Sequence, residues 1–137
     1  MGIGSDQFQL PVHSSSSSNS AVLGDHVKNW LYALRDGNAA KLALVQAELA
    51  MSTPPDPNQL VAQFSEPQGH LTWKSINVAG VYPQSDTTVD SFVSVDVEGN
   101  GPGGATKGIM VWHFVTLPQQ QGRLLSLELV SFRASAM

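Results

Sequence analysis

Residues 107–117 read KGIMVWHFVTL, and β-branched and aromatic side chains follow one another there almost without a polar interruption. Such a run is typical of a strand that is covered on both faces, since each face then carries apolar side chains. Successive side chains of a strand point to opposite faces, so the run separates into two sets. The first set is Met110, Trp112 and Phe114, and the second is Ile109, Val111, His113 and Val115. We expect a central strand with one face against helices and the other covered by a partner or exposed.

The period of two recurs on both sides of this stretch and predicts four strands, at 70–82, 87–97, 107–117 and 123–133. In the second strand the valines share one face with Ser91, and Asp90, Phe92, Ser94 and Asp96 share the other. In the fourth strand Leu125, Leu127 and Leu129 alternate with Ser126, Glu128 and Val130. Short connections make consecutive strands neighbours, so we expect an antiparallel meander. The glycine-rich stretch 98–106 is predicted to be a mobile hairpin tip.

Three helices are predicted before the strands. Val27, Trp30, Leu31 and Leu34 lie on one helical face of 25–36, and Gly37 suits a left-handed end. Asn38 is a helix cap, which starts a second helix over 38–51. The prolines of 52–57 interrupt it, and Asp56 with Pro57 starts a third helix that ends before Pro67. Helices that precede an antiparallel sheet predict an α+β domain with the helices packed on one side of a curved four-stranded sheet.

The composition excludes several classes of protein. The chain has 137 residues, which suits one domain, and a net charge of −4 without a basic stripe, so nucleic-acid binding is not expected. It has no cysteine, which excludes disulfides and thiolate metal sites. No apolar run approaches the ~20 residues that span a bilayer, so we expect no membrane insertion by this chain.

Residues 1–20 contain five consecutive serines, Ser14 to Ser18, and little apolar periodicity. This composition predicts a flexible Ser-rich tail or linker, followed by one domain over 21–137. If the segment is a tether, an extracytoplasmic location is favoured.

The order of the elements resembles the NTF2-like superfamily, within the broader cystatin-like architecture. The resemblance covers about residues 25–133 and rests on HVKNWLYALRDGNAAKL, with its Asp36-Gly37-Asn38 break, on KGIMVWHFVTL and on GRLLSLELVSF. It implies a cone-shaped helix-and-sheet fold. The family includes small-molecule pockets, isomerases and dehydratases, and also catalytically silent modules that dimerise through the sheet, some of them accessory domains of bacterial conjugation and secretion machinery.

The candidate chemistry is sparse. The four histidines, His13, His26, His70 and His113, lack metal-ligand spacing, so we expect no metal site. Of the four, His113 lies inside the central strand, where it is either an interface residue or a pocket acid or base. Tyr32, Asp90, Asp96 and Glu128 are candidates for a proton-transfer pair, or else a core-edge residue and solvent-facing carboxylates.

Two functions are therefore open. The first, which we favour, is a non-catalytic association or accessory module that forms a homodimer through Ile109, Val111, His113 and Val115 or joins a larger protein assembly. The second is a small-molecule-binding protein or isomerase-like enzyme with Tyr32, Asp90 and His113 as candidate catalytic residues. No cofactor is expected in either case.

Overall fold

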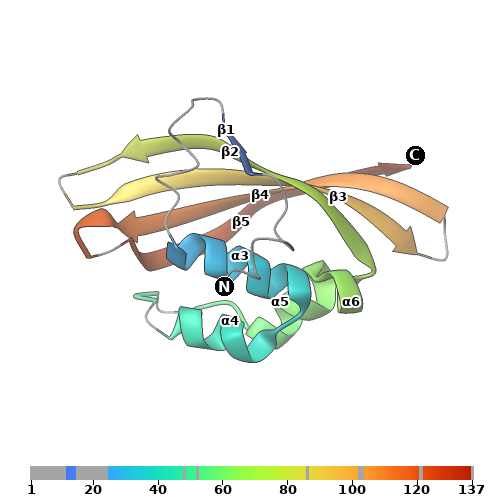
Figure 1. Ribbon diagram of the computed structural model, residues 1–137, viewed down its shortest axis with the longest axis horizontal. Helices are drawn as coiled ribbons and strands as arrows, with labels where there is room; N and C mark the ends of the chain where they lie inside the picture. The colour runs from blue at the N-terminus through green and yellow to red at the C-terminus, as the bar shows by residue number, and fades with distance from the viewer. Residues whose placement is uncertain are drawn as a thin grey trace.

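The computed structural model of the chain describes residues 12–14, 25–47, 49–51, 53–85, 87–101, 104–120 and 122–136. The helices come first, α3 (Asp25–Asp36), α4 (Ala39–Gln46), α5 (Pro57–Phe64) and the short α6 (Glu66–Gly69). The long strands follow, β2 (Leu71–Pro83), β3 (Val89–Gly101), β4 (Gly104–Leu117) and β5 (Arg123–Ala136), with the 3-10 turn η1 (Pro118–Gln120) between the last two. Helices gathered on one side of a twisted sheet confirm the predicted α+β class (Figure 1).

The four long strands form the predicted antiparallel meander, in the order β2-β3-β4-β5. A fifth strand, β1 (Val12–Ser14), extends the sheet by pairing in parallel with Ile76–Val78 of β2. It falls inside the segment predicted to be a tail. The rest of residues 1–24 lies outside the described residues.

The strands are longer than the sequence indicated at the end where β3 meets β4. Gly101 pairs with Gly104, so most of the stretch predicted to be a hairpin tip is strand, and that prediction is wrong for those residues. Residues 102–103 lie outside the described part. The extension carries Glu98 opposite Lys107 and therefore places charged side chains in the sheet.

The first helix agrees with its prediction, and the second is shorter. Asn38 caps α4 through its side chain, which accepts from the Lys41 amide at 3.0 Å. The helix ends at Gln46 rather than at 51, because the next amides find other partners. The amide of Leu49 donates to the Gln46 carbonyl at 3.1 Å, and that of Ala50 donates to the Leu125 carbonyl of β5 at 2.9 Å. The segment after α4 is thus attached to the sheet.

The third helix begins as predicted, with Asp56 accepting from the Asn58 amide at 2.9 Å and Pro57 in the first turn. It ends at Phe64. Ser65 then caps α6, which the sequence did not predict, by accepting from the Gln68 amide at 3.0 Å.

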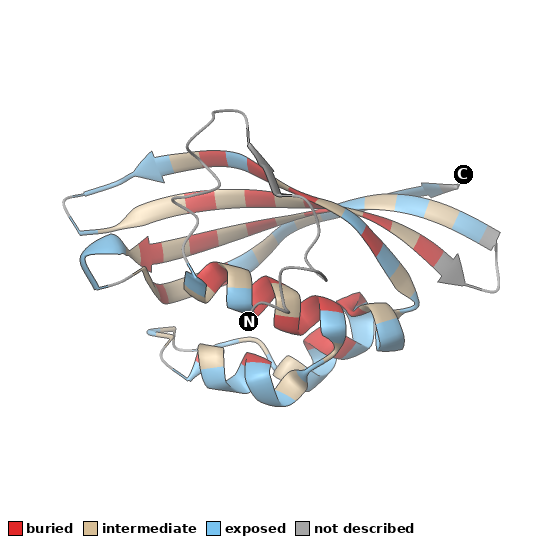
Figure 2. Cartoon of the chain, viewed as in Figure 1, coloured by how far each residue is buried: buried red, intermediate tan, exposed pale blue. Residues whose placement is uncertain are grey.

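Aromatic rings fill the space between the helices and the sheet. Trp30 of α3 contacts Trp112 and Phe114 of β4 edge to face, with ring centroids 4.9 and 5.5 Å apart. Phe64 of α5 meets Trp112 at 5.6 Å. The residues that touch the helices alternate along the strands with less buried ones (Figure 2). We call the face toward the helices the inner face and the opposite one the outer face.

Two bulges interrupt this alternation in β5. Trp112 pairs with Leu129 although Val111 pairs with Ser131, and Thr116 pairs with Leu124 although Val115 pairs with Ser126. Each bulge inserts one residue and changes which side chains face the core. Leu124 is consequently buried and Leu125 only partly so, which corrects the predicted alternation for this strand.

Candidate functional site on the outer face of the sheet

The predicted interface residues share one face, as the period of two indicated. Met110, Trp112 and Phe114 are buried on the inner face, and Ile109, Val111, His113 and Val115 alternate with them on the outer face. Helices α3 to α6 lie on the inner side only (Figure 1). No described helix covers the outer face, where Ile109 keeps 48% of its surface exposed.

An aromatic row crosses the outer face from β2 to β5. Gly80, Phe92, His113 and Glu128 are successive partners in the strand register. The rings of Phe92 and His113 are stacked, with centroids 4.6 Å apart and planes 10° apart. Tyr82 meets Phe92 at 5.9 Å edge to face and lies over Gly80, where a Cβ atom would overlap its ring. Glycine at position 80 therefore lets the row continue onto β2.

His113 lies between two carboxylates. Its Nδ1 is 3.0 Å from Glu128 Oε1, within hydrogen-bond distance, and its Nε2 is 3.7 Å from Asp90 Oδ2, an ion-pair distance only. Nε2 is buried and has no hydrogen-bond partner among the described residues. In this conformation, therefore, Nε2 has no exposed surface and Nδ1 is engaged with Glu128.

The structure brings Asp90 and His113 together and places Tyr32 elsewhere. Tyr32 lies on α3, packed against the core on the inner side of the sheet, with the Arg35 guanidinium 5.1 Å from its ring centre. Arg35 also pairs with Asp36 at 2.8 Å. The sheet therefore separates Tyr32 from the other two candidate residues.

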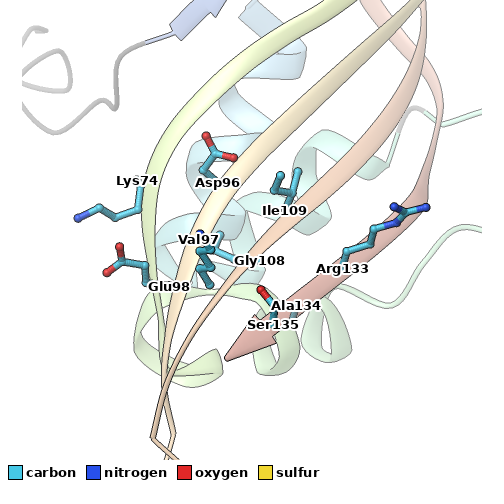
Figure 3. Close-up of a pocket in the computed structure, with 10 residues that line it drawn as sticks. Lys74, Asp96, Val97, Glu98, Gly108, Ile109, Arg133, Ala134 and Ser135 are labelled. Carbon is cyan, nitrogen blue, oxygen red and sulfur yellow. The ribbon is translucent and has the colours of Figure 1, made fainter. Parts of the chain in front are cut away.

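The opposite end of the outer face is hollowed. A depression of about 500 Å³ there is lined by residues of all four long strands, mostly outer-face side chains (Figure 3). Lys74 and Glu98 lie beside one another on β2 and β3, and Arg133 lies on β5. Asp96 is held at this end by Ser75, whose hydroxyl is 2.7 Å from the carboxylate, and by the Asn77 amide at 3.3 Å.

The two ends of the outer face differ in charge. Among the described residues, the hollow end carries three cations, Lys74, Lys107 and Arg133, beside the two carboxylates of Asp96 and Glu98. The aromatic end carries the two carboxylates of Asp90 and Glu128 with one cation, Arg123. One end is therefore slightly positive and the other slightly negative.

The described part of the chain contains no cluster of three or more His, Asp or Glu side chains that could hold a metal ion. None of its helices is long and apolar enough to cross a membrane. In comparisons with protein-family models, curated proteins and solved structures, nothing matches the chain.

Sequence reasoning placed Phe92 on the face opposite the valines but missed its stack on His113, and it missed the contribution of Tyr82. A signal for Phe92 was present, because centring the hairpin between Gly101 and Gly104 places it opposite His113. The position of Tyr82 had no such signal, since it depends on an irregular register between Val78 and Gly80.

Proposed function

We propose that the chain is an association module that forms a homodimer through the outer face of its sheet. The observation that carries the proposal is a strip that the helices leave uncovered, made of Phe92 on β3 and of Ile109, Val111, His113 and Val115 on β4. Large exposed apolar patches on soluble domains commonly mark association sites.

The size of the outer face suits a stable dimer. Strands of 13 and 14 residues, at about 3.3 Å per residue and about 4.8 Å between strands, give a face of roughly 600–800 Å². A specific interface buries about 800 Å² on each partner. Two copies that meet across this face therefore reach the usual range.

Charge and shape favour one arrangement of the two copies. A two-fold axis that lies in the plane of the interface and runs perpendicular to the strands places the aromatic end of one copy over the hollow end of the other. Each strand then lies over the same strand of the second copy, so Glu128 on β5 faces Arg133 of the second copy. Asp90 on β3 faces Glu98 of the second copy, with Lys107 of that copy beside it on β4. The exposed ring of Tyr82 lies at the same end as Asp90 and Glu128, so in this arrangement it faces the hollow of the second copy. If the two-fold axis instead runs along the strands, the two aromatic ends meet. The carboxylates of Asp90 and Glu128 in the two copies then come close to one another, which is unfavourable.

The resemblance to the NTF2-like superfamily supports the same proposal, since its silent members dimerise through the sheet. Membership remains a proposal that rests on the order of the elements and on the quoted helix and strand sequences. Docking into a larger assembly through the same face belongs to this proposal as well. The geometry lends no support to an isomerase-like site that combines Tyr32, Asp90 and His113.

Sedimentation velocity on two matched variants tests the proposal. Val111 is half-buried in the middle of the outer face, and Leu44 is 74% exposed on α4, away from the sheet. Val111→Lys should raise the dimer Kd by at least about tenfold, because it buries an unpaired ammonium group. Leu44→Lys should leave the dimer unchanged. A monomeric wild type, or a dimer that Leu44→Lys dissociates and Val111→Lys does not, contradicts the proposal.

A further inference from the structure

The hollow at the end of the outer face lies between two rows of outer-face side chains. In the strand register, the first row is Asp96, Ile109 and Arg133, and the second row is Glu98, Lys107 and Ser135. The positions between the rows, which also line the hollow, are Val97, Gly108 and Ala134. Side chains alternate between the faces, so these three residues present their backbone to the hollow. The rows are about 7 Å apart along the strands, and the volume of about 500 Å³ is within the roughly 300–1,000 Å³ of small-molecule sites. The hollow can therefore take a flat molecule between the rows.

The two carboxylates of the hollow both lie on β3 and already have polar neighbours. Asp96 accepts hydrogen bonds from the Ser75 hydroxyl and from the Asn77 amide. Glu98 lies beside Lys74 of β2 (Figure 3). The negative charge of this side of the hollow is therefore largely compensated by groups of β2.

Arg133 lies on the other side of the hollow, without a carboxylate beside it (Figure 3). Its register partner on β4 is Ile109, and β5 is the edge strand, so no strand lies beyond it. None of the ion pairs among the described residues involves its guanidinium group. The carboxylates of β3 are two strands away, about 10 Å, a distance over which physiological salt already screens exposed charges. Arg133 is thus available to an anion from outside the chain.

Lys107 adds a second cation to the same side of the hollow. It lies on the neighbouring strand and in the neighbouring row, diagonally across from Arg133. Cβ atoms in this relation are about 7–8 Å apart, within reach of two long side chains, so both cations can contact one anionic group. Ile109, which is 48% exposed, stands in the row of Arg133 and offers an apolar surface next to this pair.

We propose that the hollow binds a small, flat organic carboxylate. Its carboxylate group pairs with Arg133 and Lys107, and its apolar body lies against Ile109, over the backbone of Gly108. A guanidinium group offers two parallel N–H donors that match the two oxygens of a carboxylate. In the proposed dimer the hollow lies in the contact, so the anion and a second copy would compete for it. Binding to the monomer does not depend on that dimer.

Cinnamate and cinnamamide are the probes, because they have nearly the same shape and only cinnamate carries a negative charge. Both are titrated in a buffer of low ionic strength without carboxylate or phosphate, since salt screens exposed charges. Both should shift the ¹H–¹⁵N signals of Gly108 and Ala134, and cinnamate should bind about three- to tenfold more tightly.

A monomeric background keeps the hollow open during the titrations. Val115→Lys puts an unpaired ammonium group into the proposed contact, about 20 Å along β4 from Ile109. The wild type, at a dilution where sedimentation finds only monomer, is the control for this substitution. A wild type that is monomeric at every concentration contradicts the proposed dimer and leaves these titrations unchanged.

Two pairs of substitutions make the same change in net charge at different places. Lys107→Gln with Arg133→Gln removes two cations from the hollow. Lys28→Gln with Lys41→Gln removes two cations from α3 and α4, on the inner side of the sheet (Figure 1). The first pair should abolish the difference in affinity between the probes, and the second pair should preserve it. Ile109→Ser should weaken both probes by a similar factor, because it removes the apolar contact.

Three results would each overturn the proposal. The first is that neither probe shifts the signals of Gly108 and Ala134. The second is equal affinity of the two probes for the monomer. The third is an equal effect of the two pairs of substitutions on cinnamate binding.

Discussion

The two faces of β4 are built from similar side chains in different surroundings. On the inner face Met110, Trp112 and Phe114 are at most 1% exposed, because α3 and α5 pack on them. On the outer face Ile109 is 48% exposed, and the helices do not reach it. The inner face accounts for folding, because it closes the core. The apolar residues of the outer face are not needed for that core, which is why we propose a role in association for them.

The largest expected difference between the faces is in stability. Trp112→Ala should lower the free energy of unfolding by about 3–5 kcal/mol, because it opens a large cavity in the core. Ile109→Ala, on the same strand, should lower the free energy of unfolding of the monomer by less than about 1 kcal/mol. Urea denaturation followed by circular dichroism, at a concentration where both variants are monomeric, measures the two values. Equal losses would show that the outer face is also part of the core.

Charge reversal tests the orientation of the proposed dimer. The pair Lys107→Glu and Arg133→Glu makes both ends of the outer face acidic, and Asp90→Lys with Glu128→Lys makes both ends basic. Each double variant alone should dimerise about 100-fold more weakly than the wild type, since like charges then face each other. A mixture of the two should form a heterodimer, which native mass spectrometry detects. Homodimers of either variant that are as tight as the wild type would exclude the orientation.

The smallest effect concerns the N-terminal segment. Deletion of residues 1–20 removes β1, which pairs with β2 through three residues at the edge of the sheet. We expect the thermal midpoint to change by less than a few degrees, because a short edge strand adds little to the unfolding enthalpy of the domain. Differential scanning calorimetry checks this. A larger drop in the thermal midpoint would show that the N-terminal segment packs on the domain and contributes to its stability.

Most of the fold could be predicted from local patterns. The valines around Ser91 and the aromatic residues of β4 revealed the inner face, since a regular strand separates the two sets of side chains without knowledge of its neighbours. The cap at Asn38 and the proline after Asp56 revealed the helix starts. These features depend on residues close together in the chain.

What could not be predicted depends on contacts between distant residues. The early end of α4 follows from a hydrogen bond between Ala50 and Leu125. The bulges of β5, which bury Leu124 in place of Leu125, follow from the pairing with β4. The stack of Phe92 on His113 likewise appears only once the strands are in register.

The bulges of β5 have a further consequence for solubility. This strand of 14 residues is at the edge of the sheet, and a long regular edge offers a row of amides and carbonyls to which another chain can add. The bulges bend and twist such an edge and break the even spacing of its hydrogen-bonding groups. Arg123 and Arg133 near its two ends add positive charge that would repel a second copy of the strand. Edge-to-edge growth into fibrils is thereby discouraged, and the proposed association through the face of the sheet does not depend on this edge.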